Sequence, residues 1–327
     1  MIVKLIEKTY SLLWGDLFAI SLGNSSIGIS LMILLLVPAG IYFTIQTGFL
    51  PIRYFPQMIG TLRGKKESEN SLSSLQTLII STATRVGMGN LVGVVAAVSA
   101  GGAGAVFWMW LMALLGASTA YVEASLAQKY KDPDPLYGGY RGGPAYYIHE
   151  FLKEKTGKNR RRFLIPSLFA ISGLICWCGI SQVISNSVSS AFQNAFHIPP
   201  IVTTVILVLL AAVIILQKNA TIKLLDILVP IMAGSFFAIT VFIILLNVRQ
   251  LPAVFARIFS EAFGLRQAVS GGLGAVIMNG IKRGLFSNEA GSGSAPCAAA
   301  AAEGNDPSRT GLIQAVLSSR QKVFLMK

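Results

Sequence analysis

The sequence predicts an all-α protein that crosses a membrane several times, and two features of its composition support this. Of its 327 residues, 53% are hydrophobic and only 13% are charged, whereas soluble globular domains carry about 25% charged residues. The mean hydropathy is correspondingly high, at +0.64. Three cysteines are too few for a secreted disulfide scaffold. The composition thus argues against a large water-soluble enzyme and against a disordered chain.

Seven stretches are candidates for membrane spans, each of which needs about 20 mostly apolar residues. They cover residues 27–48, 75–100, 104–128, 163–196, 198–216, 222–247 and 267–302. The segment before them is amphipathic and lacks the layout of a signal peptide, so we expect it to lie on the membrane surface. The predicted organisation is an amphipathic N-terminal segment (1–26), a transmembrane transporter domain (27–302) and a truncated cytoplasmic tail (303–327).

The distribution of Lys and Arg predicts the orientation. Fifteen of these residues lie in the loops 49–74, 129–162 and 217–223, and five lie in the segments expected on the opposite side. Cytoplasmic loops of membrane proteins are enriched in Lys and Arg, so these loops are expected in the cytoplasm and the N-terminus outside. The net charge of +13 then belongs mainly to cytoplasmic loops, and we expect no nucleic-acid partner.

Two of the seven spans contain sequences that interrupt a helix. The second span has Gly-Met-Gly-Asn at 87–90, near the middle of a hydrocarbon layer about 30 Å thick. The seventh span has a run rich in Gly and Ser at 287–296, which ends in Pro. Irregular backbone at membrane depth is tolerated only where it is buried in protein or lines a cavity. Both interruptions are therefore candidates for a binding site.

A pair of interrupted spans is typical of secondary transporters. The exposed N–H groups at the start of a half-helix suit a carboxylate, and free carbonyls at its end suit a small cation such as Na⁺. A competing interpretation treats Gly89-x-x-x-Gly93 as a helix-packing motif. A nucleotide site is not favoured, because the glycine spacing does not match G-x-G-x-x-G.

Four runs resemble the alanine or glycine:cation symporter family, and they occur in the family's order. They are GNLVGV at 89–94, GAVFWMW at 104–110, GGPAYYI at 142–148 and KRGLFSNEAG at 282–291. The resemblance implies the fold of the amino acid–polyamine–cation transporters, with two inverted repeats of five helices after an extra N-terminal helix. It also implies Na⁺-driven transport of a small neutral amino acid, alanine or glycine, across the plasma (inner) membrane. Neither an enzymatic reaction nor an organic cofactor is implied.

The sequence departs from the family pattern in two places. Position 88 is Met, where many members have Thr, so a hydroxyl is missing beside the predicted site. After Ala315 the family continues into further spans, whereas this chain ends in a basic segment, 316–327. We therefore expect one complete repeat and only the first helix of the second. The alternative to an active symporter is an inactive truncated fragment.

The predicted site residues lie at the two interruptions and on the fourth span. The predicted substrate-binding residues are Gly87, Gly89, Asn90, Gln182, Phe286, Ser287 and Asn288. The predicted cation ligands are Ala83 and Thr84, through carbonyl or hydroxyl oxygens. Structural alternatives remain open: the amides of Asn90 and Gln182 can join helices, and Thr84 can bond back to its own helix. In the same way, Phe286 can belong to the core instead of limiting the size of the substrate side chain.

Three charged residues fall within predicted spans. They are Arg85, Glu123 and Glu289. Charges at membrane depth are costly and usually paired or functional. We therefore predict that Arg85 pairs with Glu289 or Glu123 and ties the two interrupted helices together. We expect no metal site beyond that of the transported Na⁺, because no cluster has metal-ligand spacing.

Overall fold

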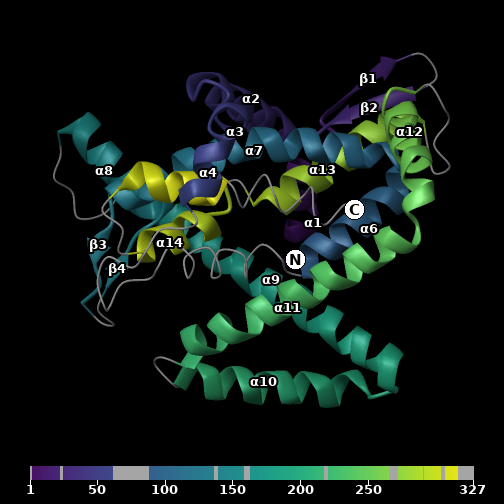
Figure 1. Ribbon diagram of the computed structural model, residues 1–327. Coiled ribbons are helices and arrows are strands. Elements are labelled where there is room, and N and C mark those ends of the chain that lie inside the picture. The colour runs from purple at the N-terminus through teal and green to yellow at the C-terminus, as the bar shows by residue number, and fades with distance from the viewer. Residues whose placement is uncertain are drawn as a thin grey trace.

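The structure is a computed structural model that describes residues 2–22, 25–61, 88–135, 139–157, 163–216, 220–264, 272–289, 291–302 and 306–315. This part of the chain is mostly helical (Figure 1). The helices are α1 (Ile2–Trp14), α2 (Leu31–Gln46), α3 (Leu50–Arg53), α4 (Phe55–Thr61), α6 (Met88–Gly101), α7 (Gly104–Lys129), α8 (Pro144–Thr156), α9 (Leu164–Phe196), α10 (Pro200–Leu216), α11 (Ala220–Leu246), α12 (Leu251–Ala262), α13 (Leu273–Asn288) and α14 (Ser294–Ala301). The short helix η1 (Val248–Gln250) precedes α12, and residues 307–315 are also helical.

Helices lie in all seven predicted spans. Two of them, α7 and α9, are long and apolar enough to cross a membrane on their own, among the residues described. A third candidate is the pair Pro230–Leu246 and Val248–Ala262, which is bent by 72° at its break. The helices α2 and α10 are apolar but shorter. Apolar helices of this kind fit an integral membrane protein.

The first predicted span begins too early, because its first residues form a hairpin. Strand β1 (Phe18–Leu22) pairs antiparallel with β2 (Ser25–Ile29), and the helix α2 starts only at Leu31. A side chain at Gly28 would collide with the carboxyl group of Asp16, so glycine lets the hairpin close against this residue. A second small sheet pairs β3 (Asp132–Pro133) with β4 (Tyr140–Arg141). The described part of the chain is thus mostly helical, as predicted, with these two small sheets in addition.

The helix α7 is the centre of a packed group formed by α2, α6, α7, α12, α13 and α14. Its closest neighbour is α13, and two glycines four residues apart allow the approach. A Cβ added at Gly280 would lie 2.5 Å from the carbonyl oxygen of Ala105, and one at Gly284 would lie 2.7 Å from Cβ of Met112. Small residues at this spacing bring helix backbones close together in membrane proteins. The same contacts show that α7 and α13 run in parallel.

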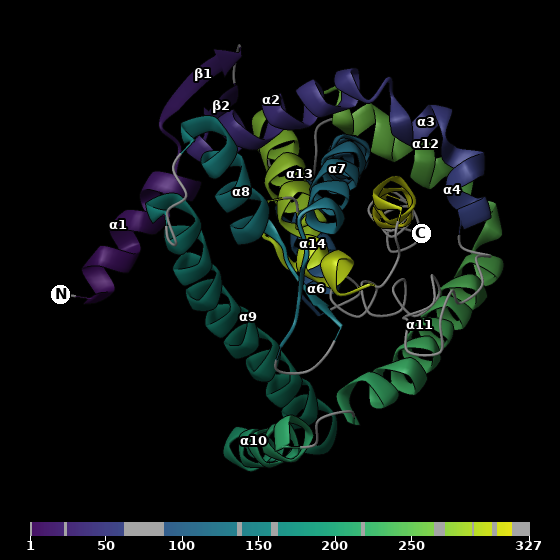
Figure 2. The same ribbon diagram turned by 90° about the vertical axis from the view of Figure 1, so that its left-hand side faces the viewer.

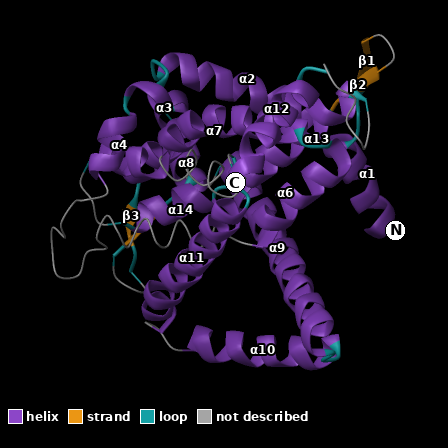
Figure 3. Ribbon diagram, turned by 45° about the vertical axis from the view of Figure 1, so that its right-hand side comes forward, coloured by secondary structure: helices purple, strands orange, loops and turns teal. Residues whose placement is uncertain are grey.

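The helices α9, α10 and α11 form a second region, which we call the arch. They outline three sides of a triangle in Figure 3, and in Figure 2 they run around the central helices α7, α13 and α14. In the most apolar stretch of α7, 56% of residues are buried, against 6% in α9. The glycines of α9 confirm this difference, because a Cβ added at Gly173 or Gly179 would meet no atom within 4 Å.

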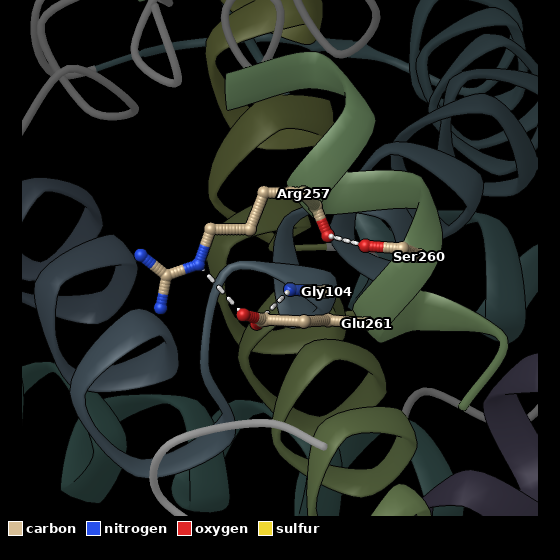
Figure 4. A network of polar contacts seen from close by, with 4 residues as sticks. All are labelled: Gly104, Arg257, Ser260 and Glu261. Carbon is tan, nitrogen blue, oxygen red and sulfur yellow. Dashed lines mark hydrogen bonds and ion pairs between the residues drawn. The ribbon is translucent and has the colours of Figure 1, made fainter. Parts of the chain in front are cut away.

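The helix α12 joins the two regions, since it follows α11 and packs on the start of α7. Glu261 of α12 is 1% exposed, and its carboxylate accepts hydrogen bonds from the N–H of Gly104 (3.3 Å) and Nε of Arg257 (2.7 Å), as Figure 4 shows. Trp108 donates its indole N–H to the carbonyl of Ala262 (3.2 Å). A carboxylate at a helix N-terminus is favoured by the helix dipole, so Glu261 fixes α12 to the end of α7.

Candidate functional site

The chain is interrupted between α13 and α14. The first helix ends at Asn288 and the second begins at Ser294. Glu289, Gly291 and Gly293 have φ angles of 54°, 82° and 89°. Glycine adopts such angles readily, whereas for Glu289 the left-handed conformation is uncommon. Two half-helices therefore meet here, and their ends leave backbone N–H and C=O groups without intrahelical partners.

Two carboxylates organise the interruption. Oγ of Ser294 donates a hydrogen bond to Oε2 of Glu289 (2.6 Å), which ties the start of α14 to the end of α13. The N–H of Gly291 donates to Oε1 of Glu123 (2.9 Å), which comes from α7. Both acidic residues thus stabilise the left-handed backbone between the half-helices. Arg85, their predicted partner, lies outside the described residues.

The last three residues of α13 point to different surroundings. Asn288 is 3% exposed and donates from Nδ2 to the carbonyl of Met112 (3.4 Å). Its side chain occupies the space that a Cβ at Gly116 would take. Ser287 is also buried, whereas Phe286 is half exposed and faces Trp14, with ring centroids 6.4 Å apart. The structure therefore places Ser287 and Asn288 within the packed group and Phe286 at its edge.

The start of α6 lies at about the same level as the end of α13. A short turn joins α6 to α7 and reverses the chain, so α6 runs opposite to α13. A Cβ at Gly101 would lie 3.0 Å from Cβ of Asn279 and 3.4 Å from the carbonyl oxygen of Ala275. From Gly101 back to Asn90 in α6 there are eleven residues, which span about 16 Å at 1.5 Å per residue. From Ala275 forward to Phe286 in α13 there are also eleven residues, so both helices cover the same distance in the same direction. Helix geometry thus aligns the predicted interruption of the second span with that of the seventh.

The remaining predicted site residues are placed less fully. Gly89 and Asn90 belong to the first turn of α6, whose backbone N–H groups have no partner within the helix. Gly87, Ala83 and Thr84 lie outside the described residues. Gln182 is exposed on α9, whose main neighbours are α8, α10 and α6. The structure therefore does not bring Gln182 to the end of α13.

Several residues that hold the second half-helix in place were not predicted from the sequence. Nε2 of Gln128, at the end of α7, donates to the carbonyl oxygens of Ala299 and Ala302. Ser294 was part of the Gly- and Ser-rich run, but no role was predicted for it. Gln128 carries a weak signal in the sequence, since it is an amide at the end of an apolar helix. Its partners lie more than 170 residues away, and no local pattern reveals them.

Burial in α8 raises the pKa of Tyr147, and the nearby carboxylate of Glu123 and thiol of Cys297 raise it further. The phenol therefore stays neutral at physiological pH. A Cβ added at Gly293 would lie 3.3 Å from Cγ of Pro144, so the start of α8 lies beside the interruption.

Comparison with known proteins identifies the family. The model of the sodium:alanine symporter family matches residues 18–320. The chain belongs to the sodium:alanine symporter family. The match includes the interruption between α13 and α14 as well as the start of α6.

Curated relatives agree with this assignment. A probable sodium/glutamine symporter of Bacillus subtilis, GlnT, is 42% identical over 90% of this chain. The amino-acid carrier protein AlsT of the same organism is 41% identical over 86% of the chain. The sodium/alanine symporter AgcS of Methanococcus maripaludis is 35% identical over 95% of the chain. The matches cover 61%, 58% and 66% of these relatives, so the chain spans about three fifths of their length.

Proposed function

We propose that the chain binds a small neutral amino acid, alanine or glycine, together with Na⁺, and moves both across the plasma membrane. The observation that carries the proposal is the interruption between α13 and α14, in a chain that belongs to the sodium:alanine symporter family. The site combines this interruption with the start of α6. No covalent step is involved, so the protein acts as a transporter and not as an enzyme.

The helix ends supply the chemistry that a zwitterion and a cation need. The N–H groups at the start of α6 and at Ser294 carry partial positive charge and suit the substrate carboxylate. The carbonyls at the end of α13 carry partial negative charge and suit a cation. We assign Gly87, Gly89 and Asn90 to the carboxylate end, and Ala83 and Thr84 to Na⁺.

The side chains at the end of α13 define the remainder of the proposed site. Ser287 and Asn288 are buried beside α7, where their side chains can bind a polar group of the substrate. We assign Phe286 to limiting the size of the substrate side chain and Gln182 to a polar contact with the substrate, which requires a movement of α9 towards α13. One methylene group changes the binding free energy by only about 1–3 kcal/mol, so alanine and glycine are both accepted.

The proposed orientation follows from the loops rich in Lys and Arg. With these loops in the cytoplasm, the N-terminus and α12 lie outside, and α14 forms the cytoplasmic half of the interrupted helix. Alternating access then opens the site first to the α12 side and later to the α14 side.

Transport is tested with the purified chain in proteoliposomes that have an inward Na⁺ gradient. We expect uptake of labelled alanine that disappears when choline replaces Na⁺ and that excess glycine inhibits. Excess glutamine, the substrate in the name of GlnT, tests the specificity: strong inhibition would assign a larger substrate. Incorporated protein without Na⁺-dependent uptake of any of the three would contradict the proposal and favour an inactive fragment.

A further inference from the structure

The second half of the interrupted helix ends inside a ring of contacts from the end of α7 and the loop that follows it. We call the four residues Gln128, Lys131, Gly142 and Gly143 the α14 collar. They enclose the end of α14, from Cys297 to Ala302, the residue that directly follows the helix.

Hydrogen bonds from the collar satisfy carbonyls at the end of α14. The last carbonyls of a helix lack intrahelical partners, and here Nε2 of Gln128 donates to those of Ala299 and Ala302. Nζ of Lys131 donates to the carbonyl of Ala302 as well (2.8 Å). Gln128 is only 4% exposed, and a cation at a helix C-terminus is favoured by the helix dipole. Both donors therefore hold α14 by its end.

Two glycines complete the collar by allowing the loop backbone to approach α14. A Cβ at Gly142 would lie 2.8 Å from Cβ of Ala300, and one at Gly143 would lie 2.5 Å from Sγ of Cys297. Gly143 also has a φ of 123°, which disfavours any other residue. The fit leaves no room for a methyl group, so α14 is held sterically as well as by hydrogen bonds.

Contacts within the loop that carries the collar stabilise its conformation. Nζ of Lys131 lies 4.0 Å from the ring centroid of Tyr140, a distance at which a cation–π attraction is significant. The strands β3 and β4 pair Asp132 with Arg141. Because the loop is fixed to itself and to the end of α7, α14 can leave the collar only as a separate body.

We propose that Gln128 is a positioning residue, which with the rest of the collar holds α14 in one access state, and that α14 leaves the collar when the site changes sides. This rests on the proposed function, because only a transporter needs α14 to move. Gln128 touches neither substrate nor ion in this account, and it acts through the carbonyls of α14.

Labelling of Cys297 tests the proposal without a transport assay. In a parent chain with Cys176→Ser and Cys178→Ser, Cys297 is the only thiol. Its side chain is exposed on one side, and on the other side Gly143 lies against Sγ. The labelling rate with a small maleimide is measured in detergent for the parent, for Gln128→Leu and for Gln193→Leu. The last variant makes the same change at an exposed position of α9. Gly142→Ala is a second variant, which crowds α14 and keeps the Gln128 hydrogen bonds.

We expect Gln128→Leu to raise the labelling rate about twofold to threefold, because the loss of two hydrogen bonds frees the side of the thiol that faces Gly143, and Gly142→Ala to raise it too. Gln193→Leu should label like the parent. Adding Na⁺ and alanine should change the rate in the parent and have less effect in Gln128→Leu. Parent-like labelling of both collar variants would overturn the proposal.

The proposal would also be overturned if the parent binds Na⁺ and alanine but labels at the same rate with and without them. The collar would then be static. If the parent binds no amino acid, the proposed function fails. The comparison of Gln128→Leu with Gln193→Leu still shows whether the collar holds α14, so the two failures can be told apart.

Discussion

The packed group around α7 and the arch of α9, α10 and α11 both contain a long apolar helix, α7 and α9, but differ in how their residues are used. Glycines in the packed group lie where backbones touch, as at Gly280 and Gly284, whereas Gly173 and Gly179 in α9 face open space. Side chains show the same contrast: Met109 of α7 is fully buried, while Leu174 of α9 is 70% exposed. Hydropathy predicts both regions as spans, but it does not distinguish a helix that packs on protein from one that presents its surface outwards.

The two regions also differ in their polar contacts. In the packed group, polar groups connect distant segments: Glu261 binds Gly104, Glu123 binds Gly291, and Gln128 binds the end of α14. Among the described residues of the arch, the hydroxyl pair Ser189 and Thr204 lies between α9 and α10, at 3.4 Å. Substitutions should therefore destabilise the packed group much more than the arch.

The largest effect is expected for Glu261→Leu. The substitution removes two hydrogen bonds to a charged group and leaves the buried N–H of Gly104 without a partner, so the free energy of unfolding should fall by about 3 kcal/mol. Glu150→Leu is the control, because its pair with Lys153 is exposed and is worth under about 1 kcal/mol. Unfolding in mixed micelles measures both. Equal losses would show that α12 is not fixed to α7 by Glu261.

A smaller effect is expected for Gly280→Ala. The added methyl group collides with the backbone of α7, and overpacking of this kind costs about 1–3 kcal/mol. Gly179→Ala in α9 should be neutral or should stabilise the protein by up to about 1 kcal/mol, because alanine favours helices and meets no neighbour there. If Gly280→Ala and Gly179→Ala change the melting temperature by the same amount, the contrast between the packed group and the arch is contradicted.

The smallest effect is expected for Ser189→Ala, in the arch. The hydroxyl contact with Thr204 is long, and Thr204 also donates to the carbonyl of Pro200 (2.8 Å). The loss should be about 0.5 kcal/mol, close to the limit of a thermal-unfolding measurement. A loss as large as that of Gly280→Ala would mean that α9 and α10 are held by polar contacts after all.

Local features of the chain could be predicted from its sequence, because they depend on neighbouring residues. The positive φ angles at Gly291 and Gly293 belong to the run that predicts an interruption, and the helix ends of α7 and α9 follow their apolar stretches. The hairpin before α2 was missed, since the apolar residues around Ile27 fit either a strand or a helix. The packing motif Gly280-x-x-x-Gly284 is visible in the sequence and also depends only on neighbouring turns of one helix.

Contacts between distant segments could not be predicted in this way. The hydrogen bonds of Gln128 with α14 and of Glu261 with Gly104 join residues more than 150 positions apart. Phe286 and Ser287 both stay predicted site residues, but consecutive residues of a helix point about 100° apart. For this reason Phe286 faces Trp14 while Ser287 is buried.

We propose that the interruption between α13 and α14 forms part of a site for an amino acid and Na⁺. Equilibrium binding of labelled alanine to the purified chain tests it most directly, in Na⁺ and in choline, with Ser287→Ala beside the matched Ser190→Ala on the exposed surface of α9. We predict saturable binding only with Na⁺, weakened about tenfold by Ser287→Ala through the loss of a hydrogen bond and unchanged by Ser190→Ala. Binding that needs no Na⁺, or that both variants leave intact, would contradict the account.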